Sequence, residues 1–430
     1  MKKARLVTIF YGLFIFVLAI RLLQNIMNGY EKESWHITEY LINYQGGFVR
    51  RGLLGEALFH VSQFTSSSPY YIIITLSLSA YIGLVYFITR AFIKKGYPIF
   101  ILPFVFFLGN PIINDFWVRK DIIELLLFIL IIHLATKTGK RFIVLINTVL
   151  IAGILIHESI AFFCLPILAL IFFYKNRKAE NAQYFYTSVL FTFLQLLPAL
   201  TAFLSVVYFK GSVSAADIIW QSWRDVKFPI ENEAYTTPQA SIDGISWTLS
   251  KGLSYFYITI KNFDFDIYAP FAWVLIITSI YFVLININNL NFGIFRHKTG
   301  GNINRAYLSA LLLIQLIAVV PLFILGWDYG RWVFLWTTSS FIVLLVLPQE
   351  TLSDMLPQYI ISVTDNINRQ FDNYLSNSRA FQSLLCLIIG VPFYNWSIIN
   401  YVDTLAPILV LQFISDTFYE GVVLIKSIFS

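Results

Sequence analysis

Long apolar runs separated by short polar segments organise the whole chain. Most runs extend over about 16 to 25 residues, the length of helix that crosses the hydrocarbon core of a bilayer. The pattern predicts spans at residues 6–27, 70–91, 98–113, 121–136, 184–208, 269–288, 306–326, 332–348 and 381–398. Residues 404–430 are ambiguous, because Asp416 and Glu420 suit an interfacial helix as well as a span.

The apolar run at residues 142–174 is too long for one span. As a single helix it would reach about 50 Å at about 1.5 Å per residue. Basic segments, KTGKR and KNRK, flank it on both sides, so an even number of crossings should separate them. We therefore expect two spans that turn at His157, Glu158 and Ser159. The fold class predicted is all-α, a polytopic transmembrane bundle of about 11 to 12 spans that forms one membrane domain over residues 1–430.

Composition supports a membrane protein and excludes other classes. Of 430 residues, 58% are hydrophobic and 13% are charged, with a mean hydropathy of +0.71, whereas a soluble protein is about a quarter charged. Cys164 and Cys386 both fall in apolar runs, which leaves no disulfide framework or zinc site. The net charge of +6 lies mostly in short basic loops, so we expect no nucleic-acid partner.

The basic loops predict the orientation of the chain. The MKKAR start places the N-terminus in the cytoplasm, and the long apolar run after it predicts an anchor that is not cleaved. The alternation of spans assigns the other basic loops to the same side, with Lys94, Lys95, Arg296, Lys298 and Arg305. Segment 349–380 is then cytoplasmic and the large loop 209–268 external. We expect a multi-pass protein of the bacterial inner membrane, in contact with its lipid bilayer.

Four charged clusters fall on the opposite, external side. They are QGGFVRRGLLGE (45–56), NDFWVRKDIIE (114–124), HES (157–159) and GWDYGRW (326–332). Their cations, Arg50, Arg51, Arg119, Lys120 and Arg331, run against the positive-inside tendency. Their carboxylates are Glu56, Asp115, Asp121, Glu124, Glu158 and Asp328. Because charges near membrane depth usually face a bundle interior or an aqueous cavity, the clusters predict a polar cavity at the outer leaflet.

Each cluster also has a purely structural interpretation. Arg50 and Arg51 could anchor the interface by snorkelling, before an amphipathic helix over the following GLLGEALFHVSQF segment. Asp121 could be a helix N-cap with Glu124 at the third helical position. His157 and Glu158 could be a buried pair, and Asp328 and Arg331 a salt bridge. The tryptophans could form an aromatic belt.

The residue types in the clusters fit a lipid-linked sugar pyrophosphate. Arginine matches phosphate oxygens in pairs, and His157 and Lys120 would assist the arginines. Trp35, Trp117, Trp327 and Trp332 suit stacking on sugar rings. For a general base we rank Glu158 and Asp328 first and Glu56 third. Partial burial at the turn should raise the pKa of Glu158. There is no HExxH motif and there are five His, so we expect neither a metal nor another cofactor.

At these residues the chain resembles bacterial surface-polysaccharide polymerases, the Wzy and EpsG-like proteins of O-antigen, capsule and exopolysaccharide assembly. The resemblance lies in the order of Arg119-Lys120-Asp121, His157-x-Ser159 and Gly330-Arg331-Trp332, and in the GGFVRRGLLGE segment. It implies a glycosyltransferase of the broad GT-C type that joins units carried on undecaprenyl pyrophosphate at the periplasmic face, with other polysaccharide-assembly proteins as partners. These polymerases often carry arginines in large periplasmic loops, whereas loop 209–268 has only Arg224.

That departure leaves a polymerase and a single-transfer polyprenyl-phosphate-sugar glycosyltransferase both open. Two other classes also remain. A transporter or flippase of lipid-linked sugars would need a charged cavity, but it should show interrupted spans in corresponding halves, and the hydropathy pattern shows none. A membrane O-acyltransferase would use a histidine with a cytoplasmic thioester donor, and His157 is predicted to lie on the other side.

Overall fold

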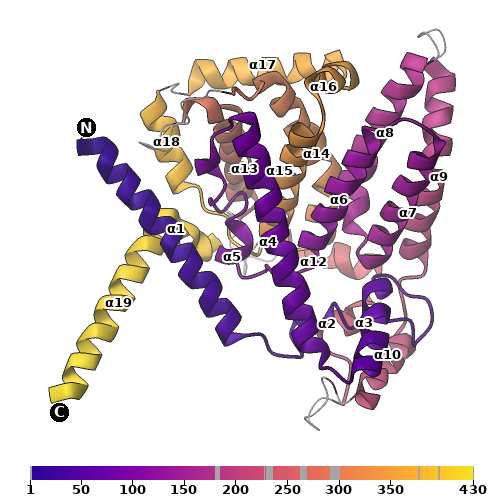
Figure 1. Ribbon diagram of the computed structural model, residues 1–430, viewed down its shortest axis with the longest axis horizontal. Coiled ribbons are helices and arrows are strands. Elements are labelled where there is room, and N and C mark those ends of the chain that lie inside the picture. The colour runs from indigo at the N-terminus through magenta and orange to yellow at the C-terminus, as the bar shows by residue number, and fades with distance from the viewer. Residues whose placement is uncertain are drawn as a thin grey trace.

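The chain is a polytopic bundle of helices in the computed structural model (Figure 1), as the sequence predicts. The structure describes residues 2–179, 185–226, 228, 236–261, 269–290, 301–375, 378–395 and 398–429, and these contain no strand. Arg296 and Lys298, which were expected to help set the topology, lie outside these ranges. So do the side chains of Lys2, Lys3 and Arg5 and the middle of the large loop.

Within the described part of the chain, six helices are long and apolar enough to cross a membrane. They are α1 (Lys2–Asn28), α4 (Pro69–Lys95), α8 (Ser159–Ala179), α9 (Phe185–Tyr208), α14 (Arg305–Leu325) and α15 (Tyr329–Val346). Shorter helices accompany them at three more of the predicted spans, α6 (Asp121–Ala135), α7 (Lys140–Ile156) and α13 (Ala269–Ile285). The hairpin predicted at 142–174 is present, because α7 ends at Ile156, α8 begins at Ser159, and His157 between them is extended.

The remaining elements are short or lie at the ends of the bundle. They are α2 (Trp35–Thr38), α3 (Gly52–Thr65), η1 (Ile99–Ile101), α5 (Asn110–Ile113), α10 (Val213–Asp225), α11 (Ala240–Gly244), α12 (Leu249–Lys261), η2 (Ile287–Asn289), α16 (Gln349–Met355), α17 (Gln358–Tyr374), α18 (Arg379–Ile388), η4 (Ile398–Thr404) and α19 (Ala406–Phe429). Helix α3 is the helix predicted after Arg51. The ambiguous C-terminal segment is the long helix α19, which packs against α1 on the left of Figure 1.

The prediction of a helical span at 98–113 is wrong. This segment is mostly non-helical, and it runs along the first part of α15 inside the protein. Thr337 donates a hydrogen bond to the carbonyl of Phe106 at 2.7 Å, and Asn110 Nδ2 donates to the carbonyl of Gly330 at 3.0 Å. Non-helical backbone is tolerated at membrane depth only where protein or water satisfies its polar groups. Thr337 does so for the carbonyl of Phe106, and the hydroxyl of Tyr81 does so for the carbonyl of Leu108 at 2.7 Å.

The prediction of a last helical span at 381–398 is also wrong. Helix α18 ends at Ile388, and the chain continues without regular structure towards the start of α15. There the amide of Gly330 donates to the carbonyl of Phe393 at 2.9 Å, and the amide of Asn395 donates to the carbonyl of Trp327 at 3.0 Å. The two interrupted segments therefore meet at Gly330, where an added Cβ would lie 2.7 Å from the carbonyl oxygen of Pro392.

The large loop folds against the segment that carries α2 and α3. Trp223 of α10 is buried and donates from Nε1 to the carbonyl of Leu41 at 2.7 Å. In α3, an added Cβ on Gly55 would lie 1.9 Å from the carbonyl oxygen of Ile42. The glycines around Arg50 and Arg51 thus allow close backbone packing, which fixes both arginines at one end of the bundle.

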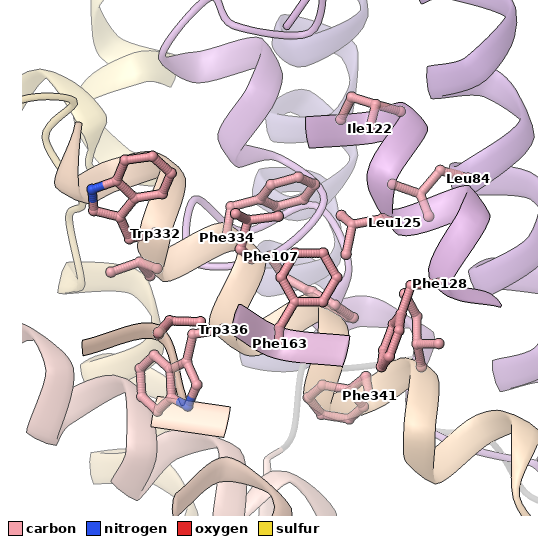
Figure 2. Packing of buried hydrophobic residues seen from close by; sticks show 14 of the residues in the cluster. Leu84, Phe107, Ile122, Leu125, Phe128, Phe163, Trp332, Phe334, Trp336 and Phe341 are labelled. Carbon is pink, nitrogen blue, oxygen red and sulfur yellow. The ribbon is translucent and has the colours of Figure 1, made fainter. Parts of the chain in front are cut away.

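Helix α15 forms the centre of the core. Every residue from Gly330 to Leu345 is buried, and Figure 2 shows its aromatic side chains packed among those of neighbouring segments. Phe341 lies 4.9 Å from Phe107, measured between ring centroids, and Trp336 donates to the carbonyl of Leu312 at 2.7 Å. A helix that is apolar on all sides is buried on all sides. Arg331, at its first turn, is therefore held in a rigid position.

Candidate functional site

A cavity of about 540 Å³ opens where the α7–α8 turn, the α14–α15 turn and residues 34–51 meet. Among the described residues, its charged lining consists of Arg50, Arg51, Arg119, Glu158, Lys210, Asp328 and Arg331, and His36, His157 and Ser159 add polar groups. Residues from all four charged clusters thus come together, although three of the predicted site residues lie elsewhere.

Arg331 is paired with two carboxylates. Its Nε donates to Asp121 Oδ2 at 2.9 Å, its Nη2 lies 2.8 Å from the same oxygen, and its Nη1 donates to Asp328 Oδ2 at 2.6 Å. The salt bridge expected between Asp328 and Arg331 is therefore present. Asp121 is the first residue of α6 and makes no N-cap, because Lys120 occupies the cap position and the Asp121 carboxylate turns to Arg331 instead. Asp328 remains partly exposed and lines the cavity.

Arg119 is held by Glu39, a buried carboxylate that the sequence interpretation missed. Arg119 Nε donates to Glu39 Oε2 at 2.9 Å, and the amide of Lys120 donates to Glu39 Oε1 at 3.0 Å. Burial alone would raise the pKa of Glu39, but Arg119 and Arg331 outweigh it and hold the pKa below its usual value. One sequence signal was available: Glu39 directly precedes the apolar Tyr40, Leu41 and Ile42.

Glu158 is fixed by the two arginines before α3. Arg51 donates from Nε and Nη2 to the two carboxylate oxygens at 2.8 and 2.5 Å, and Arg50 Nη1 lies 3.7 Å away. Burial raises the pKa of this carboxyl, but the Arg51 contact dominates and leaves the pKa of Glu158 well below normal. The expectation of a raised pKa is wrong. A carboxylate bound in this way is a poor general base.

His157, Ser159 and Glu124 form a buried chain beside the cavity. His157 Nδ1 lies 2.6 Å from Ser159 Oγ and 3.1 Å from Glu124 Oε1, and Ser159 Oγ donates to Glu124 Oε2 at 2.5 Å. Ser159 and Glu124 therefore hold the imidazole of His157 from its Nδ1 side. Burial, and then Arg51, lower the pKa of His157 well below its usual value. The neutral imidazole lines the cavity, and its lowered pKa makes it a weak proton acceptor.

Arg50 keeps spare hydrogen-bonding capacity in the cavity wall. Its Nη2 donates to the carbonyl of Gly244 at 2.9 Å, whereas its buried Nε has no partner within the described residues. Its side chain is 24% exposed, close to the 22% of Arg51, against 7% for Arg119 and 2% for Arg331. A ligand phosphate in the cavity would therefore meet Arg50 and Arg51 more readily than Arg119 and Arg331.

Tryptophans line the same cavity. Trp35, Trp327 and Trp332 are there as expected, together with Trp247 of the large loop, which the sequence interpretation did not select. The ring centroids of Trp35 and Trp247 are 5.9 Å apart, and those of Trp247 and Trp327 are 6.2 Å apart. Lys251 lies over the Trp247 ring at 3.9 Å. Trp35, Trp247 and Trp327 keep exposed ring surface of the size of a sugar ring, whereas Trp332 is buried.

Trp117, Lys120 and Glu56 do not line the cavity. Trp117 is fully buried against Tyr30. Lys120 is also buried, and its Nζ donates to the carbonyls of Arg51 and Ile156 at 3.2 and 3.3 Å, joining the starts of α3 and α6 to the end of α7. Burial lowers the pKa of Lys120 to about 8.

The remaining carboxylates of the clusters are also turned to other partners. Glu56 lies on α3 and accepts from the amide of Tyr44 at 2.8 Å. Asp115 accepts from the hydroxyl of Tyr30 at 2.5 Å.

The prediction of a metal-free site depends on the absence of ligand motifs. However, Asp264-Phe265-Asp266 is an Asp-x-Asp segment of the large loop, and it lies outside the described residues.

An apolar wall completes the cavity on the side of α8, α9 and α14. It consists of Phe162, Phe203, Val206, Val207, Leu322 and Leu325. Outward-facing residues of α9, such as Leu204, are exposed on the bundle surface. The cavity is therefore cationic at one end and apolar at the other.

Comparisons with protein-family models, with curated proteins and with solved structures find no match.

Proposed function

We propose that the chain is a GT-C-type glycosyltransferase that joins lipid-linked oligosaccharide units, the polymerase reaction of O-antigen or capsule assembly. The observation that carries the proposal is the two-sided cavity, with arginines and tryptophans at one end and an apolar wall at the other. A glycan on undecaprenyl pyrophosphate has the matching parts: an anionic pyrophosphate, sugar rings and an isoprenoid chain. The resemblance of the charged motifs to surface-polysaccharide polymerases supports the same reaction.

The proposed chemistry follows from the charges. An acceptor hydroxyl attacks the anomeric carbon of the donor sugar and gives its proton to a base. The bond from that carbon to the pyrophosphate breaks, and Arg50, with Arg51 behind it, stabilises the departing pyrophosphate. Asp328 is the first choice for the base. It lines the cavity, and within the described residues its contacts with Arg331 and Arg119 both use Oδ2, whereas Arg51 occupies both carboxylate oxygens of Glu158. Neutral His157 is the second choice for the base. Glu158 is not a candidate, because it is an anion that orients Arg51.

The orientation belongs to the same proposal. The cavity lies at the end of the bundle away from the KTGKR and KNRK loops, so the positive-inside rule puts it at the periplasmic face of a bacterial inner membrane with a cytoplasmic N-terminus. Single transfer from a polyprenyl-phosphate sugar uses the same cavity and remains the closest alternative.

A transporter of lipid-linked sugars is the second candidate, and one observation favours it. The interrupted segments 98–113 and 389–395 meet at Gly330 beside the cavity, and broken crossings are typical of transporter binding sites. This observation was not foreseen from the hydropathy pattern.

Lipid-linked intermediates in cells distinguish the two functions. In a host without this chain we expect an undecaprenyl-pyrophosphate glycan to accumulate on the periplasmic side while long surface glycan disappears. The measurement is mass spectrometry of the lipid extract, combined with an impermeant enzyme that cleaves only periplasmic glycan. Accumulation on the cytoplasmic side would establish the transporter, and an unchanged lipid pool would contradict both functions.

A further inference from the structure

A second cavity, of about 390 Å³, lies at the opposite end of the bundle from the site above. It is enclosed by the turn between α6 and α7 and by α8 and α9, which stand together on the right of Figure 1. Lys137, Lys175 and Lys178 line it, and none of the described residues in its wall is acidic. The wall of this cavity is therefore cationic, and Asp354 and Glu350 lie outside it near Lys178.

The three lysines keep hydrogen-bonding capacity for a ligand. Lys175 Nζ donates to the carbonyl of Lys137 at 2.6 Å, and Lys178 Nζ donates to the hydroxyl of Tyr174 at 3.2 Å. Each ammonium group has three donors, so these contacts leave others unused. The Tyr174 hydroxyl in turn donates to Asp354 Oδ2 at 2.7 Å. The carboxylate of Asp354 therefore has a partner and lies outside the cavity wall.

Below the lysines the wall becomes apolar. Phe142, Ile143 and Ile146 of α7 and Phe172 of α8 form it, with the amide side chains of Asn176 and Gln195 between the two levels. Outward residues of α9 next to the cavity, such as Leu190, Phe193 and Leu194, are exposed on the bundle surface. In a bilayer these residues face acyl chains. The cavity thus has a cationic rim and an apolar floor beside the lipid.

We propose that this cavity binds an anionic phospholipid, with its phosphate among Lys137, Lys175 and Lys178 and an acyl chain against Phe142 and Ile143. Basic pockets between transmembrane helices on the cytoplasmic side bind anionic head groups, and the KTGKR and KNRK segments that form this rim are the ones that predict the cytoplasmic side. Lysine binds phosphate as a point charge and needs no paired geometry. The apolar floor favours a lipid over free phosphate.

The test measures lipid retention by the purified full chain. Native mass spectrometry and titration in detergent would compare phosphatidylglycerol and cardiolipin with phosphatidylcholine. We expect a variant with Lys137→Gln, Lys175→Gln and Lys178→Gln to bind the anionic lipids at least about tenfold more weakly, because each lysine adds to the attraction. Replacing the same three residues with arginine should keep binding, which separates loss of charge from misfolding.

The matched control removes three exposed cations from other segments at the same end of the bundle, none of which lines the cavity, by Lys94→Gln, Arg369→Gln and Arg379→Gln. It should bind within about twofold of the unaltered chain. Equal weakening of lipid binding in both triple variants would show that the lipid responds to the overall surface charge and not to this cavity, and would overturn the proposal. So would equal binding of phosphatidylcholine, or complete displacement of the lipid by millimolar inorganic phosphate.

Discussion

Replacing Arg331 with methionine is expected to lower the free energy of unfolding by about 3 to 5 kcal/mol, because it leaves a buried carboxylate without its partner. Arg331 is 2% exposed and Asp121 is fully buried, and Arg331 Nη2 lies 2.8 Å from Asp121 Oδ2. The effect should be visible as a large fall in the thermal unfolding temperature of the purified chain in detergent.

The matched control is Arg90→Met on α4, because Arg90 is exposed and contacts only Tyr86 within the described residues. It should change the unfolding temperature little. Adding Asp121→Asn to Arg331→Met should restore part of the lost stability, since the unpaired charge is then removed. Equal stability of the Arg331→Met and Arg90→Met proteins would show that the buried ion pair is absent.

Asp328→Asn is expected to lower the rate of glycan transfer by about 10² to 10⁴-fold, the usual contribution of a positioned general base. Asparagine keeps the shape and still accepts a hydrogen bond from Arg331, so the chain should fold and insert. The measurement is the length distribution and amount of surface glycan in a host that expresses the variant at a matched level.

Glu56→Gln is the control for that variant, because Glu56 belongs to the same set of carboxylates but does not line the cavity. Its glycan should be normal. Glu158→Gln should act mainly through Arg51, and therefore through stability. Normal glycan in the Asp328→Asn host would remove Asp328 as the base and transfer that role to His157, which His157→Gln would then test.

Much of the bundle could be predicted from the sequence, because span length and basic loops are local properties. The turn at His157 and Glu158 is an example: a 50 Å helix would overrun the bilayer by about 20 Å. The interrupted segment 98–113 could not be predicted in this way. Its apolar sequence resembles that of a helical span. Its backbone carbonyl at Phe106 accepts from Thr337, and the Asn110 side chain donates to the carbonyl of Gly330; both partners are more than 200 residues away in the sequence.

The charged clusters were recognisable, but their pairings were not. Asp121 looks like a helix cap in the sequence because the cap pattern is local, whereas its partner Arg331 is 210 residues distant. Glu158 looks like a base because turns in membranes are partly buried. Its pKa, however, is set by Arg51, 107 residues away. The chemistry of buried charges therefore depends on long-range contacts that a single sequence does not display.

The reaction proposed for the larger cavity is the transfer of glycan from one lipid carrier to another. The most direct measurement uses the purified chain in lipid nanodiscs. The substrate supplied is the lipid-linked glycan extracted from cells that do not contain this chain. Mass spectrometry should show a lipid-linked product of twice the glycan length, together with an equal amount of released undecaprenyl pyrophosphate, and Asp328→Asn protein should form neither. A lipid-linked glycan that stays unchanged with the purified, folded chain would contradict the proposed reaction.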